Sequence, residues 1–380
     1  MANRLELSGE RFHAVYRLAG DRDRAEATAR RICLEQTVEY PEDLIDRDEI
    51  REQVFGRLVS LEPSGEECFR ATIAYPSEVA GRELTQLLNV LMGNISLEPG
   101  IRLLEFDLPP GLAAHYRGPR FGREGLRRLA RAERRPLLCS AIKPMGLPIA
   151  ELAELAYDLA RGGMDFVKDD HGLSDQSFCR FEQRVERCAA AVERANRESG
   201  GHCRYAPNVT APFGELPERV RLAARVGAGA VVISPGLTGF DAMRSIADDD
   251  DSSLPVFAHP AFLGGFSVVR DSGISHGALF GRLMRLAGAD ATIFPNYGGR
   301  FSFTREDCRE LVDGTLCPLG NLAPGFPVPA GGMKLENVEE MIDFYDRDVI
   351  LLIGGDLHRH GPDLTATCRG FASLVRETFD

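Results

Sequence analysis

Four consecutive residues, Lys168-Asp169-Asp170-His171, place groups with chemical capability side by side. Asp170 is two residues beyond Lys168, so the two side chains share one side of an extended strand. An unpaired ammonium is costly in a low-dielectric interior, whereas a neutral lysine reacts with CO₂ to give a carbamate, which is an oxygen ligand. A carbamate, the Asp170 carboxylate and waters would suit the octahedral shell of Mg²⁺. The alternative interpretation is a plain Lys–Asp ion pair.

Other polar residues and glycines also follow short apolar runs. They are Lys143, Asn208, His259, Arg300 and the pairs Gly331-Gly332 and Gly354-Gly355. Exposed N–H groups at such glycine pairs, close to helix N-termini, form anion-binding concavities. Glycine would be required there because a side chain would block the approach of a phosphate. Each residue alone also fits a satisfied polar group or a turn, but together they favour a site that binds a phosphorylated small molecule.

The elements that must position these residues repeat along the second part of the chain. Eight short apolar runs, each followed by an amphipathic segment, indicate parallel strands alternating with helices. The predicted strands cover residues 137–142, 165–168, 204–207, 230–233, 255–258, 291–294, 326–329 and 349–352. Eight units favour a closed (β/α)₈ TIM barrel, whose active site lies at the carboxyl ends of the strands. A doubly wound open sheet is the structural alternative.

The first part of the chain has a different pattern. Strands at 11–18, 53–61, 67–75 and 101–107 and helices at 21–33 and 83–92 give the order β-α-β-β-α-β. This order is typical of a ferredoxin-like α+β domain. An arginine-rich segment at 117–135 reads as a helical connection. We therefore expect a ferredoxin-like domain at 1–125 and the barrel at 126–380.

Composition excludes several classes of protein. The 380 residues, 44% hydrophobic and 27% charged, are ordinary for a globular protein of two domains. A net charge of −12 without a basic stripe argues against a nucleic-acid partner. No run approaches the ~20 apolar residues of a membrane helix. Nine scattered cysteines with no CxxC pair, and an N-terminus without an apolar signal segment, predict reduced thiols and a cytoplasmic location.

These residues also match a known family. The segments "IKPMGL" at 142–147 and "GGMDFVKDDHG" at 162–172 resemble the first two strand-end motifs of the RuBisCO large-chain superfamily. The segments "PVPAGG" at 327–332 and "LIGGDLHRHGP" at 352–362 resemble its two phosphate-gripping glycine segments. Two N-terminal segments, "LEQTVEYPED" at 34–43 and "LMGNISLEPG" at 91–100, fit as well. The resemblance extends over nearly the whole chain.

The resemblance implies roles for individual residues. Lys168 resembles the lysine that is carbamylated and holds one Mg²⁺ per site, and Asp170 resembles a metal-ligating carboxylate. Lys143 resembles a lysine that handles protons at the enolate carbon, and His259 one that contacts substrate hydroxyls. The four glycines resemble the phosphate-binding backbone.

A second implication concerns assembly. Glu35 and Asn94 resemble residues that the partner subunit contributes across a dimer interface. The resemblance therefore implies a homodimer whose active site is shared between the subunits.

Four departures from the family pattern bear on function. His171, the third candidate metal ligand, stands where a metal-ligating Glu is usual, and Met145 stands near the place of a second lysine. Pro260 replaces an arginine that follows the strand-5 histidine. The flexible lysine loop after strand 6 is replaced by "NYGGRF", in which Arg300 is nearest in position. Without these parts the chain is expected not to fix CO₂ and is similar to the RuBisCO-like proteins of form IV.

The retained residues predict Mg²⁺-assisted enolate chemistry on a phosphorylated keto sugar or keto sugar acid, with a monophosphate favoured. The sequence slightly favours a carboxy-lyase type reaction, which is decarboxylation or hydrolytic C–C cleavage of a 3-oxo sugar acid phosphate. An isomerase or enolase of a methylthio-ketose phosphate in sulfur salvage is the enzymatic alternative. A non-catalytic RuBisCO-like binding protein is the third possibility.

Overall fold

The computed structural model describes residues 5–379 and forms two compact units. The first contains the chain up to Arg117 together with 263–283 and 317–322, and the second contains the other described residues. The sequence placed one boundary at 125/126 and kept the second domain continuous. The two later segments instead group with the first unit, in part because strand β10 (Gly273–Ile274) pairs in parallel with strand β4 (Ile101–Phe106).

The first unit has the predicted ferredoxin-like order. Its strands form one sheet in the order β10-β4-β1-β3-β2, in which β4, β1, β3 and β2 pair antiparallel with one another and β10 pairs in parallel with β4. Its main elements are β1 (Arg11–Ala19), α1 (Arg22–Glu35), β2 (Arg57–Pro63), β3 (Cys68–Pro76), α4 (Leu84–Met92) and β4.

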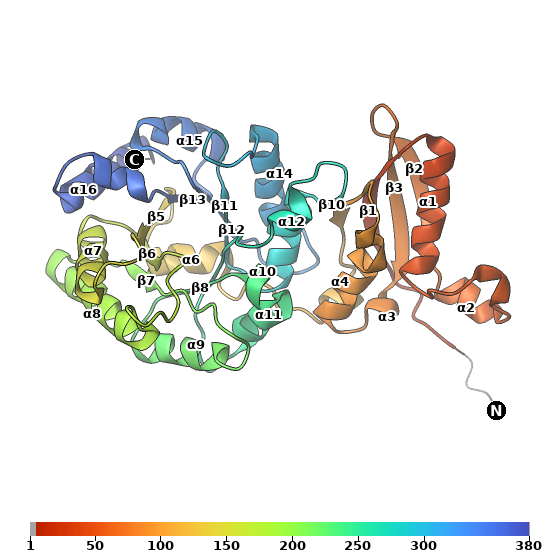
Figure 1. The fold of residues 1–380 in the computed structure, drawn as a ribbon, viewed down its shortest axis with the longest axis horizontal. Coiled ribbons are helices and arrows are strands. Elements are labelled where there is room, and N and C mark those ends of the chain that lie inside the picture. The colour runs from red at the N-terminus through yellow and green to blue at the C-terminus, as the bar shows by residue number, and fades with distance from the viewer. Residues whose placement is uncertain (1–4, 380) are drawn as a thin grey trace. The chain divides into compact units, whose positions relative to one another are not determined.

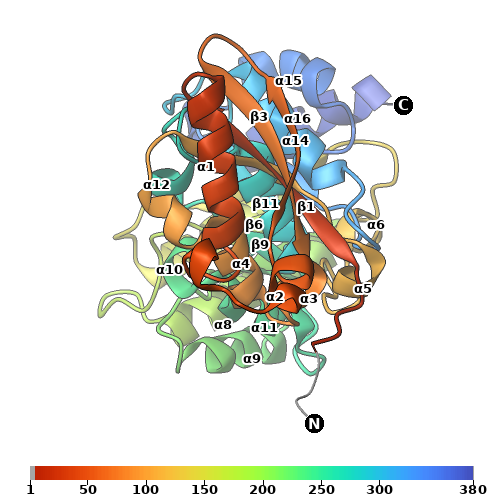
Figure 2. The same cartoon turned by 90° about the vertical axis from the view of Figure 1, so that its right-hand side faces the viewer.

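Helix α1 lies along this sheet (Figure 2). Asp21 caps its first turn by accepting a hydrogen bond from the Arg24 N–H at 2.9 Å, and Ala25, Ala29 and Ile32 are buried. The predicted strand at 53–61 was placed too early. Residues Asp48–Gln53 form helix α2, whose first turn holds two acidic side chains, a favourable position for negative charge at a helix start.

The second unit is a barrel of eight parallel strands surrounded by helices (Figure 1). Two four-stranded ladders, β12-β11-β9-β8 and β13-β5-β6-β7, make up the ring. They join where Asn208 bridges Val232 in parallel and where β12 lies beside β13. The strands are β5 (Leu137–Ile142), β6 (Phe166–Asp169), β7 (Arg204–Ala206), β8 (Val231–Ile233), β9 (Val256–Ala258), β11 (Ala291–Pro295), β12 (Phe326–Ala330) and β13 (Ile350–Leu352). The closed ring confirms the barrel over the open sheet.

Helices follow the strands in the predicted alternation. They are α7 (Ile149–Arg161), α8 (Phe181–Ser199), α9 (Leu216–Arg225), α11 (Phe240–Asp248), α14 (Arg305–Leu316), α15 (Val338–Tyr345) and α16 (Leu364–Phe379). One of the amphipathic segments, after β9, forms a π-helix, Gly277–Leu283, followed by the short α13 (Met284–Leu286). Among residues 5–379, no helix combines the length and apolar character needed to cross a membrane.

Side chains fill the interior of the barrel, so a ligand can bind only at its ends. Phe166 and Phe257 meet inside it with ring centroids 5.0 Å apart. Leu126 and Ala130 of α6 (Gly122–Ala130), within the predicted connection at 117–135, join the same apolar cluster. Because this cluster is solid, the side chains at the carboxyl ends of the strands are exposed to ligands only from that rim.

Candidate functional site

Lys168 is the most buried of the predicted site residues that carry a charge. It is on β6, next to Ala141 of β5 and Ala206 of β7, and is only 3% exposed. Its Nζ donates to the carbonyl of Asp169 at 2.8 Å. Burial lowers the pKa of the Lys168 ammonium below its ordinary value, and the nearby positive charge of Lys143 acts in the same direction. Both effects shift the balance toward the neutral amine, which is the form that reacts with CO₂.

Asp169 faces the opposite way and has a structural role. Its carboxylate is fully buried and accepts hydrogen bonds from Arg184 Nε at 3.1 Å and the Tyr205 hydroxyl at 2.5 Å. The backbone N–H of Asn208 donates to it at 3.0 Å. A buried carboxylate with a paired guanidinium and two further donors is satisfied, so Asp169 anchors the end of β6 to helix α8 and strand β7.

The loop that follows β6 is held by Asn208. The Asn208 Nδ2 donates to the carbonyls of His171 and Leu173, both at 2.9 Å. Its Oδ1 accepts from the N–H and hydroxyl of Thr210 at 3.2 and 2.7 Å. Asn208 was predicted to bind substrate, but its amide is committed to the protein, which makes it a positioning residue for the loop.

Asp170, His171 and His259 come together at the carboxyl ends of β6 and β9. The Nδ1 atom of His171 is 3.7 Å from Oδ1 of Asp170. The His171 ring stacks on His259 with centroids 4.4 Å apart and an interplanar angle of 12°. Burial opposes ionisation of Asp170, but His171 and Lys168 outweigh it and hold the pKa of this carboxyl below its ordinary value. Burial, aided by Lys168 and His171, lowers the pKa of His259, which favours the neutral ring.

The donor chemistry of this cluster fits a divalent cation. Asp170 supplies an ionised carboxylate that is partly exposed, and His171 supplies an imidazole nitrogen beside it. Lys168 would ligate only after CO₂ converts its amine to a carbamate, for which its burial and lowered pKa are suited. The residues that would hold the cation are therefore Lys168, Asp170 and His171, and their role as ligands stays a prediction.

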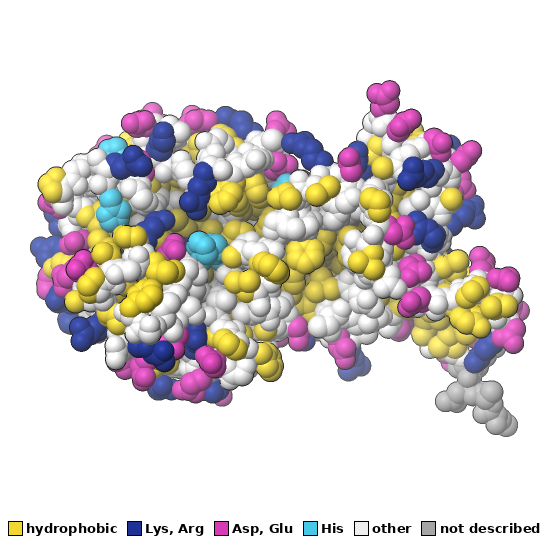
Figure 3. Space-filling view, viewed as in Figure 1, with side chains coloured by type: hydrophobic (Ala, Val, Ile, Leu, Met, Phe, Trp, Pro, Cys, Tyr) yellow, Lys and Arg dark blue, Asp and Glu magenta, His cyan; other side chains and the backbone are white. Residues whose placement is uncertain are grey.

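A second feature of the same rim is a cavity of about 780 Å³. The two predicted glycine pairs line it, and so do Lys143 and Arg300. The remaining lining residues are Met333, Lys334, Glu336, Leu352, Asp356, Arg359 and His360. Four Lys or Arg side chains face two carboxylates, so the cavity suits an anion. On the face shown in Figure 3, basic and histidine side chains gather over the barrel.

Two of the glycines are needed because of close approaches. Gly332 has φ +111° and, with a Cβ, would approach the Cα of Gly299 to 2.6 Å. A Cβ on Gly354 would be 2.9 Å from the Lys143 Nζ. A side chain at either position would therefore displace backbone or the lysine. The Lys143 ammonium thus packs directly over Gly354 in the wall of the cavity.

Arg300 reaches the cavity from the loop after β11. Its guanidinium lies over the ring of Phe301, 4.9 Å from the centroid. The sequence did not single out Lys334, Asp356, Arg359 or His360, although the spacing of Asp356 and His360 is a recognisable i,i+4 pair. His360 Nε2 is 3.1 Å from the Asp356 carboxylate, which also accepts the Leu335 N–H at 2.9 Å. Asp356 therefore ties the two glycine segments together.

Glu35 and Asn94 belong to the first unit, where they are neighbours. The Asn94 Nδ2 donates to Glu35 Oε1 at 2.9 Å and to Glu39 Oε1 at 3.1 Å. Asn94 is exposed and Glu35 is half-buried. The first unit thus presents the two side chains together, and their role across a dimer interface stays a prediction.

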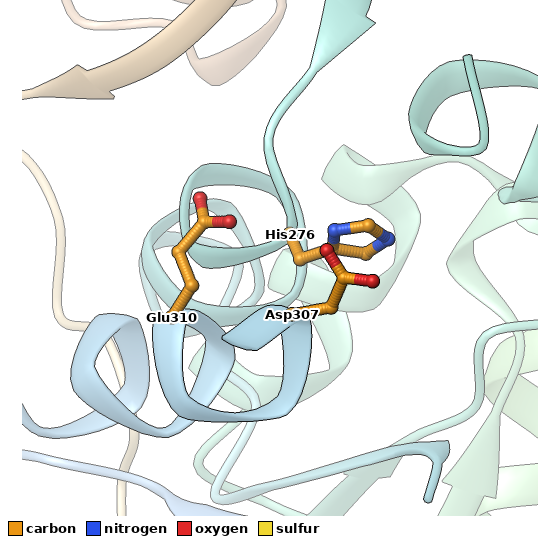
Figure 4. Close-up of side chains that lie close together, drawn as sticks. All are labelled: His276, Asp307 and Glu310. Carbon is orange, nitrogen blue, oxygen red and sulfur yellow. The ribbon is translucent and has the colours of Figure 1, made fainter. Parts of the chain in front are cut away.

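Three further side chains with metal-binding groups are drawn in Figure 4: His276, Asp307 and Glu310. Asp307 already serves helix α14, because its carboxylate accepts the Thr304 N–H at 2.9 Å while the Thr304 hydroxyl accepts the Asp307 N–H at 3.1 Å. His276 belongs to the first compact unit and the two acids to the second. No metal site is assigned to them.

Known proteins resemble this chain over almost its full length. Residues 123–371 match the family model of the ribulose bisphosphate carboxylase large chain, catalytic domain. A 5-methylthioribulose-1-phosphate isomerase of Rhodospirillum rubrum is 40% identical, covering 96% of each chain. A 2,3-diketo-5-methylthiopentyl-1-phosphate enolase of Bacillus licheniformis is 31% identical over 95% of this chain and 91% of its own.

A solved structure also shares the fold of this chain. The crystal structure of a Rubisco-like protein from Rhodopseudomonas palustris superposes with a TM-score of 0.88 at 37% identity. The match covers 98% of this chain and 99% of that one. The family model matches more than half of the chain, and the relatives are similar over nearly all of it. Together they identify the family. The chain belongs to the RuBisCO large-chain family and is a RuBisCO-like protein.

Proposed function

We propose that this protein moves a proton at the carbon beside the carbonyl of a phosphorylated keto compound, as an isomerase or enolase of a methylthio-ketose phosphate. Two features of the barrel rim support this proposal. One is the anion-suited cavity with its glycine pairs, which would hold the phosphate. The other is the Lys168–Asp170–His171 cluster, which would stabilise the enolate.

The position of Lys143 is the observation that carries this proposal. Its Nζ packs against Gly354 in the cavity wall, and its charge is close enough to Lys168 to lower the pKa of that residue. A substrate whose phosphate occupies the cavity would therefore present the carbons near the phosphate to Lys143. A lysine held between a phosphate grip and an enolate site is placed to give or take the proton.

The cluster itself requires a covalent change before it can bind a cation. The neutral Lys168 amine adds to CO₂, a C–N bond forms, one proton leaves, and a carbamate anion results. A divalent cation held there supplies positive charge that stabilises the enolate oxygen. Asp170 contributes the second anionic oxygen, while Asn208 and the Arg184–Asp169 pair hold the loop that carries it.

The names of the relatives change the preference among the two enzymatic reactions. The sequence slightly favoured decarboxylation or C–C hydrolysis of a 3-oxo sugar acid phosphate. The similar proteins described above are named as an isomerase and an enolase of methylthio-phosphates. Both names denote proton transfer with the carbon chain intact, so we place this reaction first.

The test compares the two substrate classes directly. Purified protein with Mg²⁺ and bicarbonate is incubated with 5-methylthioribulose 1-phosphate, with 2,3-diketo-5-methylthiopentyl 1-phosphate and with a 3-oxo sugar acid phosphate. Products are followed by NMR and released CO₂ is measured. We expect a rearranged methylthio-phosphate of unchanged carbon number. Release of CO₂ from the sugar acid, with no reaction of the two methylthio compounds, would overturn the proposal.

We further propose that the active form is a homodimer in which Glu35 and Asn94 of one subunit complete the site of the other. Complementation tests this idea, because Asn94→Ala and Lys168→Ala damage different halves of a shared site. Each variant is expected to be inactive alone, and the co-folded mixture is expected to regain activity. A mixture as inactive as its parents would place both residues in one subunit's own site.

A further inference from the structure

The pairing of Asp170 with His171 makes this cluster unusual for a hard cation. The Asp170 Oδ1 and the His171 Nδ1 are 3.7 Å apart, which is too far for a hydrogen bond. The contact therefore leaves the imidazole nitrogen without a strong partner in the carboxylate. Both atoms therefore keep a lone pair available for a third group.

The stack on His259 limits how His171 turns. The two rings are nearly parallel, with an interplanar angle of 12° and centroids 4.4 Å apart. Asn208 fixes the backbone beneath the ring by donating to the His171 carbonyl at 2.9 Å. The imidazole is thus held from its face and from its backbone, and its Nδ1 edge stays directed to Asp170.

Donor spacing suits a shared cation. Metal–nitrogen and metal–oxygen bonds to borderline cations are about 2.0–2.2 Å long. Two donors bound to one ion therefore lie about 3–4 Å apart, depending on the angle between the bonds. The observed 3.7 Å falls in this interval. This separation corresponds to an angle of about 120° at the ion, wider than the right angle between adjacent octahedral ligands, so a modest side-chain rotation would bring Asp170 and His171 onto one cation.

Ligand type then decides which cation is preferred. Carboxylate and water oxygens suit Mg²⁺, whereas imidazole suits first-row transition cations. We propose that the Lys168–Asp170–His171 cluster prefers a transition divalent cation such as Mn²⁺ or Co²⁺ to Mg²⁺, and that the His171 nitrogen sets this preference. The inference rests on the metal-assisted function proposed above and names the class of cation that the site takes.

The first arm of the test measures affinities. Full-length protein is freed of metal by chelation and titrated calorimetrically with Mg²⁺, Mn²⁺ and Co²⁺ in bicarbonate buffer. Any site with N and O donors favours the transition cations to some degree, so the informative quantity is the ratio of affinities. His171→Glu replaces the nitrogen by oxygen and is expected to lower the Mn²⁺/Mg²⁺ ratio by about tenfold or more, the scale on which changes around a metal alter affinity.

The second arm detects the ligand atom itself. Electron spin echo spectroscopy of bound Mn²⁺, in protein labelled with ¹⁵N-histidine, reports whether an imidazole nitrogen is coordinated. We expect a nitrogen coupling in the wild-type protein and its loss in His171→Glu. His202→Gln is the matched control, because His202 is an exposed histidine at the amino-terminal side of β7. It should leave the coupling and the affinity ratio unchanged.

The outcomes separate this inference from the proposed function. Mn²⁺ that binds without nitrogen coupling, or a ratio that His171→Glu leaves unchanged, overturns the inference while metal-assisted catalysis stands. Failure of the wild-type protein to bind any of the three cations overturns both. A cation bound through His171 without turnover of any methylthio-phosphate contradicts the proposed reaction alone.

Discussion

The Asn208 side-chain amide donates to the carbonyl of His171 at 2.9 Å, from a segment just beyond β7 that is separate from the loop it holds. This single contact links the end of β7 to the residue that follows Asp170. A loop that carries candidate ligands is therefore positioned by an asparagine that touches none of the reacting groups. Groups of this kind orient ligands and tune their affinity.

Asn208→Ala removes both donors to the loop. We expect the cation affinity to fall by 10- to 100-fold, about the loss seen when outer partners of metal ligands are removed. The free energy of unfolding should also fall by about 1–3 kcal/mol, because one buried and one partly buried carbonyl lose their partner. Calorimetric titration and urea unfolding measure the two effects.

Asn196→Ala is the matched control for this prediction. The Asn196 amide donates to the Cys203 carbonyl at 2.9 Å and accepts the Cys203 N–H at 2.8 Å, before the start of β7. It should cost comparable stability and leave cation affinity unchanged. Equal losses of affinity in both variants would mean that the effect is one of general destabilisation.

Lys143→Met removes the ammonium that packs over Gly354 while keeping a long side chain. We expect kcat to fall by about 10²–10⁴-fold, the usual contribution of a positioned proton-transfer group. Lys334→Met alters another lysine of the same cavity and should mainly raise KM. Steady-state kinetics with the methylthio-phosphates separates the two patterns. If both variants change only KM, Lys143 holds phosphate and does not transfer the proton.

Asp290 gives the barrel a pH dependence of its own. Its buried carboxylate accepts the N–H groups of Phe121, Gly122 and Val256, but burial raises its pKa to about 6. The unfolded value is about 3.9, so the folded state binds more protons between these values. Stability from this group is therefore present below about pH 4 and is lost as pH rises toward 6.

Asp290→Asn tests this sign. The stability of the wild-type protein relative to the variant should fall by about 2 kcal/mol between pH 4 and pH 6 and stay level above it. Urea unfolding across this range measures the difference. A relative stability that rises with pH would show that the three N–H donors outweigh burial.

The sequence predicted the fold well because its signals were periodic. Eight apolar runs at regular spacing indicated the barrel, and the turn glycines after β12 and β13 marked the rim where the anion-suited cavity lies. The second strand was misplaced because Asp48–Gln53 reads as polar chain until its acidic first turn is seen to begin a helix. The segment at 263–283 could not be assigned from sequence, because its pairing through β10 depends on a two-residue contact.

The sequence indicated which side chains lie together at the rim, and their roles in binding metal or substrate stay predictions. Lys168, Asp170, His171 and His259 gather at one rim because strand order places them there. Asn208 was assigned to the substrate because its position at a strand end is compatible with either role. Only the hydrogen bonds of its amide distinguish positioning from binding. The contribution of Asp356 likewise depends on a partner in another glycine segment, Leu335, which spacing does not reveal.

The proposed proton transfer on a phosphorylated ketose depends on Lys168, which would hold the cation that stabilises the enolate. Its most direct test is ¹H NMR of 5-methylthioribulose 1-phosphate in D₂O, with protein, bicarbonate and either Mg²⁺ or Mn²⁺. We predict that the proton beside the carbonyl is relocated or exchanged with no carbon lost, and that Lys168→Ala abolishes this reaction. A proton that does not move in the presence of the wild-type protein, or one that moves equally fast with Lys168→Ala, would contradict the account.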